Sequence, residues 1–208
     1  MANPARFWNF IAKRYARQPI ADEASYQKKL DMTRAYLTPQ SKVLEFGCGT
    51  GSTALLHAPY VSHILATDFS EAMISIARQK ALEGEIQNVT FQAVGIDDLY
   101  TEQDTYDAVL GMNILHLVND RLAVFEKVFG LLKPGGVFES TTPCLTGMSG
   151  FAKALLPIGA ALGLLPRVSF LSSSELMGEM EKTGFELTQD WQPEPNKALF
   201  LVVRKPAA

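Results

Sequence analysis

Apolar positions follow two different periods along this chain. Short apolar runs alternate with stretches in which apolar residues recur three and four positions apart, the spacing of one helix face. The expected strands are 43–46, 62–68, 88–94, 106–117 with a loop at its end, 137–141, 185–191 and 198–204. The expected helices are 4–17, 22–37, one from 52, one from 70, 119–132 and 172–182. This alternation predicts an α/β fold whose parallel sheet is doubly wound, with right-handed crossovers.

Two stretches depart from the alternation. The runs 185–191 and 198–204 are joined by 192–197, a short segment with two prolines, which predicts an antiparallel hairpin that closes the sheet. Residues 154–166 carry no charge, yet prolines and glycines break the stretch, and it is too short to span a bilayer. We therefore expect a single domain that carries an apolar insertion at 143–171.

Three glycines at alternate positions, Gly47, Gly49 and Gly51, separate the first strand from the next helix. Glycine permits positive φ, and its missing Cβ lets a ligand lie against the backbone at a helix N-terminus. A dinucleotide fingerprint would place its last glycine one position later, where Ser52 stands. The turn predicts a ligand site, and a strand-to-helix turn without a ligand is the alternative.

An acid, Asp68, ends the second expected strand. In a nucleotide-binding βαβ unit, a carboxylate at this place can accept hydrogen bonds from both ribose hydroxyls. The alternative is an ordinary acid in a loop.

Composition narrows the function classes. The net charge of −3 and the pI near 5.6 do not favour a general nucleic-acid binder. The two cysteines, Cys48 and Cys144, give no disulfide framework, so a reducing, cytoplasmic setting is expected. His57 and His63 have no Cys or acid at ligand spacing, and we expect no metal site.

These features together resemble the class I S-adenosylmethionine (SAM)-dependent methyltransferases over roughly 40–205. The G-x-G-x-G turn, Asp68, the Tyr106-Asp-Ala-Val run and the Leu-Leu-Lys-Pro-Gly-Gly136 turn carry the resemblance. It implies a Rossmann-like, doubly wound, mostly parallel seven-stranded sheet with an antiparallel strand in the C-terminal hairpin. It also implies SAM as cofactor and a four-part domain. The parts are a helical cover (1–39), a SAM-binding core (40–142), an insertion over the acceptor site (143–171) and a closing helix and hairpin (172–208).

The resemblance also implies roles for individual residues. Glu45 and Gly47 would lie beside the amino-acid end of SAM, and Gly49 and Gly51 would let it pass over the turn. Asp68 would hold the ribose. The remaining cofactor-binding residues implied in this way are Phe69 beside the adenine, Ile96, Asp97, Asn113 and Tyr15.

One position departs from the family pattern. Many members carry an Asp just after the third strand that accepts the adenine amino group, and Gly95 stands there. The backbone N–H of Ile96 could still serve the ring. Asp97 or Asp98 could take over the amino group, or both could be solvated loop acids.

The N-terminal segment 8–15 resembles the cofactor lid of small-molecule members similar to the ubiquinone/menaquinone biosynthesis methyltransferases. The polar side of this helix carries Arg6, Lys13, Arg14 and Arg17 and no acid. Peripheral contact with a membrane surface is one interpretation, and a solvated face over a packed helix is the other.

The acceptor is expected to be a small molecule. Asn113-Ile-Leu-His116 stands where an N-P-P-Y-type tetrapeptide would serve amino methylation of DNA bases or glutamine amides. His116 is a candidate general base, with packing or a structural role as alternatives. If the insertion overhangs the site, its apolar residues favour a quinone-, lipid- or aromatic-like substrate, and packing on the sheet or on a second subunit is the other interpretation.

Two other functions remain open at this stage. A nicotinamide-dependent dehydrogenase would share the first half of the sheet, but Ser52 and the closing hairpin disfavour it. A non-catalytic SAM-binding or membrane-surface interaction protein is the third reading. The acceptor, the methylated atom, the use of a base and the oligomeric state do not follow from the sequence.

Overall fold

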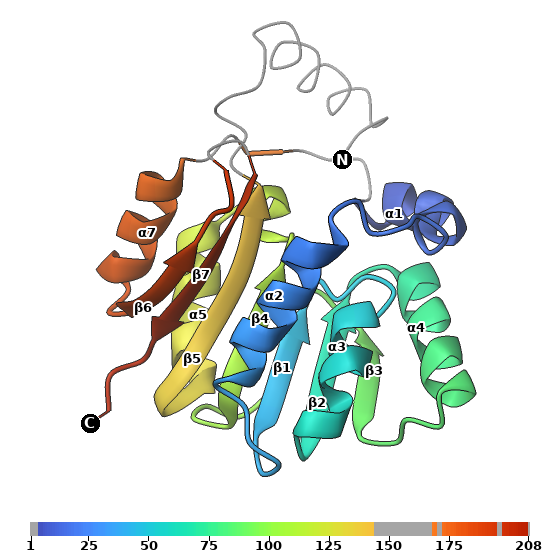
Figure 1. Ribbon diagram of the computed structural model, residues 1–208, viewed down its shortest axis with the longest axis horizontal. Helices are drawn as coiled ribbons and strands as arrows, with labels where there is room; N and C mark the ends of the chain where they lie inside the picture. The colour runs from blue at the N-terminus through green and yellow to red at the C-terminus, as the bar shows by residue number, and fades with distance from the viewer. Residues whose placement is uncertain (1–3, 144–167, 170–171, 195–196, 208) are drawn as a thin grey trace, which may run out of the picture.

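A seven-stranded sheet with helices on both faces forms the molecule, as the computed structural model in Figure 1 shows. The structure describes residues 4–143, 168–169, 172–194 and 197–207. The strands are β1 (Lys42–Phe46), β2 (His63–Asp68), β3 (Val89–Ala93), β4 (Tyr106–Met112), β5 (Leu132–Pro143), β6 (Glu186–Trp191) and β7 (Ala198–Arg204). The helices are α1 (Pro4–Tyr15), α2 (Glu23–Arg34), α3 (Ser52–His57), α4 (Glu71–Glu83), α5 (Arg121–Leu131) and α7 (Ser173–Lys182), with short 3₁₀ turns η1 (Ala58–Tyr60) and η2 (Leu115–Leu117).

The strand order is β3-β2-β1-β4-β5-β7-β6. The pairs from β3 to β5 are parallel, and β7 runs antiparallel to both β5 and β6. The expected fold class, with its antiparallel strand in the C-terminal hairpin, is therefore confirmed. The order reverses next to β1, so the carboxyl ends of β1 and β4 flank the crevice where open α/β sheets bind ligands.

Neighbouring residues of each central strand face opposite sides of the sheet, because side chains alternate along a strand. Leu44 and Phe46 pack with α5 and α7, whereas Val43 packs on the side of α4. The rings of Phe46 and Phe138 stack with centroids 6.1 Å apart. Two apolar layers thus hold the sheet between helices, and the ligand-binding edge is left to the loops.

The turn expected at Lys133-Pro-Gly-Gly136 is part of a strand. Helix α5 ends at Leu131, and β5 already pairs with β4 at Leu132 before its register shifts. Gly135 takes a φ of 78° inside this irregular stretch. The residues typical of a turn therefore mark an irregularity within β5 rather than a loop that precedes the strand. The apolar run 154–166 of the expected insertion lies outside the described residues.

Candidate functional site

The glycine turn between β1 and α3 adopts a left-handed backbone at all three glycines, with φ of 63°, 54° and 74° at Gly47, Gly49 and Gly51. Their absent side chains make room for different neighbours. A Cβ at Gly47 would lie 2.5 Å from the Ile114 side chain, and one at Gly51 would lie 2.7 Å from Phe91. A Cβ at Gly49 meets only Tyr15, at 3.9 Å. The space at Gly47 and Gly51 is thus filled by the protein, whereas a Cβ at Gly49 would make only an ordinary van der Waals contact with Tyr15.

Asp68 ties the end of β2 to the glycine turn. Its two carboxylate oxygens accept backbone hydrogen bonds from Gly49 (3.0 Å) and Ser70 (2.8 Å). Each oxygen keeps a further lone pair for a ligand hydroxyl. Burial raises the pKa of this carboxyl, and the two N–H donors partly oppose that rise. The side chain is therefore held in place before any ligand arrives.

Glu45 lies beneath the turn and is almost fully buried. The backbone N–H of Ala54, in the first turn of α3, donates to its carboxylate, while Oε2 has no hydrogen-bond partner among the described residues. Burial raises the pKa of Glu45 to about 8, and the nearby Asp68 charge adds to the rise. Glu45 is a buried acid with an unused oxygen at a helix N-terminus.

Helix α1 covers the turn from the side of α4, at the carboxyl edge of the sheet (Figure 1). Its Asn9 accepts hydrogen bonds from the Ser70 hydroxyl (2.7 Å) and the Ala72 N–H (3.1 Å) at the start of α4. At the end of α1, burial and the charges of Asp68 and Glu45 raise the pKa of the Tyr15 phenol. Tyr15 thus lies within electrostatic reach of both acids, and its contact with a cofactor stays a prediction.

Tyr26 is a site residue that the sequence analysis did not find. It lies on α2, its hydroxyl is 3.4 Å from the Thr53 hydroxyl of α3, and the Glu45 charge contributes to its raised pKa after burial. In the sequence, Tyr26 stands out only as an aromatic residue of the expected helix 22–37. Nothing in the sequence pairs that helix with the glycine turn.

The residues expected around an adenine gather after β2 and β3. Phe69 is 36% exposed, and a Cβ at Gly95 would lie 3.9 Å from the Cβ of Phe69. Ile96 is buried, and its backbone N–H makes no hydrogen bond within the described residues. Asp97 is exposed, and its carbonyl accepts a hydrogen bond from Lys127. A free N–H beside Phe69 fits the expected role of Ile96 toward a ring.

The loop after β4 brings Asn113 and His116 to the same edge. Asn113 has a φ of 56°, and its N–H bonds the Thr141 carbonyl at 2.7 Å. Burial lowers the pKa of His116 to about 4, and its Nδ1 is buried without a hydrogen-bond partner in the described structure. The imidazole is therefore neutral near pH 7 and a weak base.

The charge of this site comes from the acids Glu45 and Asp68 and from Lys80, whose ammonium donates hydrogen bonds to the Thr50 and Ser52 hydroxyls (3.1 Å each). The Asp68 charge raises the pKa of Glu45, and the charges of both acids raise the pKa of the Tyr15 phenol, whereas no Lys or Arg contributes to the pKa of either carboxyl. Such a site suits a ligand that carries positive charge. A pyrophosphate at the N-terminus of α3 would instead meet the Glu45 carboxyl. SAM, with its sulfonium and ammonium groups, therefore fits the residues present better than a dinucleotide does.

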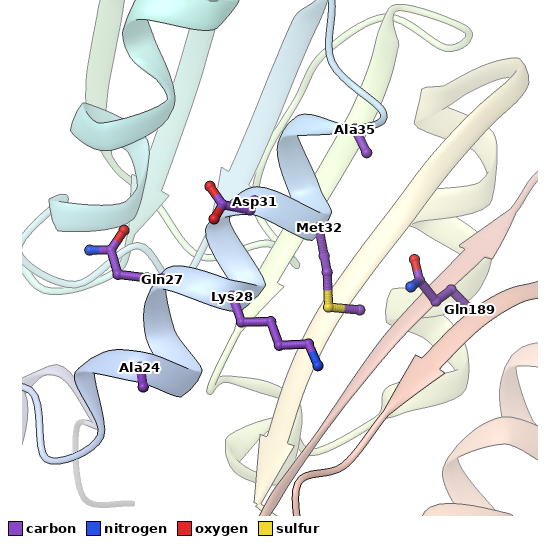
Figure 2. Close-up of a pocket in the computed structure, with 7 residues that line it drawn as sticks. All are labelled: Ala24, Gln27, Lys28, Asp31, Met32, Ala35 and Gln189. Atoms are coloured by element: carbon purple, nitrogen blue, oxygen red, sulfur yellow. The ribbon is translucent and has the colours of Figure 1, made fainter.

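A separate groove lies between α2 and β6. Its cavity volume is about 590 Å³, and Figure 2 shows Lys28 and Met32 of α2 and Gln189 of β6 at its walls. No residue of the glycine turn lines it. In the described residues, no group of three His, Cys, Asp or Glu side chains is placed to hold a metal. No described helix is long and apolar enough to cross a membrane.

Comparisons with known proteins agree with this geometry. Residues 43–136 match a family model described as a methyltransferase domain. The chain is similar to the ubiquinone biosynthesis O-methyltransferase of Xanthomonas campestris pv. campestris, at 31% identity over 182 residues that cover 82% of this chain and 75% of that protein.

Among solved structures, an S-adenosylmethionine-dependent methyltransferase from Mesorhizobium loti superposes with a TM-score of 0.71 at 20% identity, covering 88% of this chain and 99% of that one. The [4+2]-cyclase SpnF superposes with a TM-score of 0.72 at 18% identity, covering 87% and 81%. Likeness at these identities shows the fold alone, so the family is decided by the sequence relatives.

Proposed function

Because the chain belongs to the class I SAM-dependent methyltransferases, we propose that it methylates an oxygen of a small, apolar, aromatic acceptor. It is an enzyme with SAM as its cofactor and a small molecule as its acceptor. The choice of oxygen is supported by the curated relatives, which are named as O-methyltransferases of ubiquinone biosynthesis. The aromatic, apolar class is supported by the same names and by the uncharged run 154–166 of the sequence.

The observation that carries the proposal is the pair of buried acids at the glycine turn. Asp68 is already oriented by two backbone N–H groups, and Glu45 keeps one oxygen unpaired. In our proposal Asp68 accepts the ribose hydroxyls, and Glu45 receives the ammonium end of the cofactor. In our proposal the absent side chain of Gly49 lets the ligand lie against the turn beside Tyr15. The nicotinamide-dependent alternative is not favoured, because the Glu45 carboxyl lies where its pyrophosphate would bind.

Bound SAM supplies a methyl group on a sulfonium. The chain must therefore orient the acceptor oxygen in line with that methyl group and keep water away. His116, with a pKa of about 4, is a weak base near pH 7, so in our proposal the acceptor hydroxyl gives its proton to bulk water as it enters the site. The new C–O bond then forms as the S–C bond breaks, and S-adenosylhomocysteine leaves. We assign His116 a positioning role beside the acceptor.

The test combines binding and turnover on the intact protein. Calorimetric titration with S-adenosylhomocysteine should show binding, whereas NADH should give none. Incubation with isotopically labelled methyl-SAM and a panel of catechols, hydroquinones and aliphatic amines should label the phenols. Tight binding of NADH, or labelling of the amines alone, would overturn the proposal.

We further propose that the enzyme is cytoplasmic and contacts a membrane surface, where apolar acceptors dissolve. Support comes from the cationic side of α1, with Arg6, Lys13, Arg14 and Arg17 exposed. The small number of cysteines supports the cytoplasmic setting.

A further inference from the structure

The exposed side of α1 combines four cations with a protruding aromatic ring. We propose that this surface docks on an anionic lipid membrane. We call it the basic face, and its members are Arg6, Phe10, Lys13, Arg14 and Arg17. Their spacings of three, four and seven residues put them on one side of a helix, and the turn continues past Tyr15 through the Ala16-to-Ala12 hydrogen bond of 2.9 Å. All five are exposed, and Phe10 is 88% exposed.

The cations of the basic face are not neutralised by the protein. In the part of the chain that the structure describes, none of the four side chains makes an ion pair, a hydrogen bond or a cation–π contact. The first acid of the sequence is Asp22, after the whole helix. The chain has a net charge of −3, so these cations form a local patch on an acidic protein.

The opposite side of α1 fixes the direction of the basic face. Ala12 is 1% exposed, and the rings of Trp8 and Tyr15 meet edge to face with centroids 6.3 Å apart. Asn9 adds its two hydrogen bonds to the start of α4. Figure 1 shows α1 beside α4 at the carboxyl edge of the sheet, and with one side held on α4, the helical spacing places the basic face on the side turned away from α4.

The composition of the basic face favours a lipid surface over nucleic acid. Anionic headgroups attract Lys and Arg, and an aromatic ring among the cations can enter the boundary between headgroups and acyl chains. Packing of α1 does not explain why position 10 carries an aromatic residue, because Phe10 is almost fully in solvent. Docking would bring Tyr15 and the glycine turn next to the membrane, where an apolar acceptor enters. This consequence rests on the proposed methyl transfer to an apolar acceptor, whereas lipid binding does not.

Co-sedimentation with vesicles tests the docking surface directly. The intact protein is mixed with phosphatidylcholine vesicles, with or without phosphatidylglycerol, at low and high salt. Each Lys or Arg near an anionic surface contributes about fivefold in partitioning. The double variant Lys13→Gln/Arg17→Gln should therefore bind anionic vesicles about 25-fold more weakly. The matched control Lys42→Gln/Lys182→Gln removes the same charge from two other exposed sites and should bind as the unchanged protein does.

A substitution of Phe10 tests the part of lipid binding that charge alone does not explain. Phe10→Ser should weaken binding to anionic vesicles with the net charge unchanged, and circular dichroism confirms that the variant is folded. The proposal is overturned if anionic vesicles bind no better than neutral ones, or if both double variants lose binding equally. It is equally overturned if the basic face binds single-stranded RNA but not vesicles. Binding of S-adenosylhomocysteine, measured in parallel, shows whether the proposed function stands independently of lipid binding.

Discussion

Replacing Glu45 by Gln tests the electrostatic reading of the cofactor site. Glu45 is buried under the glycine turn with a pKa of about 8, so about one side chain in ten is ionised at pH 7. An ammonium group binds the ionised form. The protein must therefore release a proton before the pair can form, and the affinity for the cofactor should rise with pH.

The size of this effect follows from the pKa. The ionised fraction grows from about 1% at pH 6 to about one half at pH 8, so the Kd of S-adenosylhomocysteine should fall about 50-fold over this range. The amide of Glu45→Gln has no proton to release and no charge to offer. At pH 8 the variant should bind about 10- to 150-fold more weakly, which corresponds to about 1.5–3 kcal/mol for a hydrogen bond to a charged group.

Calorimetric titration at several pH values measures both quantities. Repeating the titration at pH 7 in buffers of different ionisation enthalpy gives the protons released, which should approach one for the unchanged protein and zero for Glu45→Gln. The ligand's own amino group titrates identically in both proteins, so the ratio of their Kd values at each pH isolates the contribution of Glu45. Equal affinities and equal proton release for the two proteins would refute the assignment of Glu45 to the cofactor's ammonium end.

Further substitutions test the remaining parts of the site and the core. Asp68→Ala should weaken S-adenosylhomocysteine binding by about 1.5–3 kcal/mol, and unchanged affinity in the folded variant would remove the ribose assignment. Gly49→Val should abolish binding in calorimetry while circular dichroism stays unchanged, because the Val side chain would occupy the place beside Tyr15 where the ligand lies against the turn, at a φ of 54°. Burial raises the pKa of Glu139 to about 7, so the protonated side chain stabilises the fold. Urea unfolding should show that this contribution to the free energy of unfolding is fully present below about pH 4.5 and is lost as the pH rises through about 7. Over this pH range the free energy of unfolding should fall by about 3 kcal/mol less in Glu139→Gln than in the unchanged protein. Identical pH profiles of the two proteins would contradict the raised pKa.

The strands and helices could be predicted from the sequence because each follows a local apolar period. The doubly wound, mostly parallel arrangement also followed, since right-handed crossovers leave few topologies. The extension of β5 back to Leu132 could not, because Lys133-Pro-Gly-Gly136 has the residues of a turn. Only pairing with Tyr106, a neighbour in space, shows that this stretch belongs to the strand.

The site was predictable to the extent that its residues are contiguous or end a strand. The turn glycines, Glu45 and Asp68 meet these conditions. The spacing of the three glycines does not show which of them have a neighbouring side chain in the place of a Cβ. Phe91, which fills the space at Gly51, comes from the distant strand β3. Asn9 likewise has the sequence context of any polar helix residue, and only the docking of α1 turns it into a partner for the start of α4. Contacts between distant segments are what the local pattern leaves undetermined.

The anchoring of α1 bears on the expected role of segment 8–15 as a cofactor lid. Two hydrogen bonds accepted by Asn9 and a buried Ala12 hold the helix on α4, and each such bond contributes about 0.5–1.5 kcal/mol. Swinging α1 away would also expose the apolar contacts beside Ala12. A helix held in this way acts as a fixed wall, with Tyr15 toward the glycine turn and the basic face toward the outside. If so, the cofactor site opens without movement of α1, and the acceptor's path runs between a wall that stays in place and the membrane on which that wall rests.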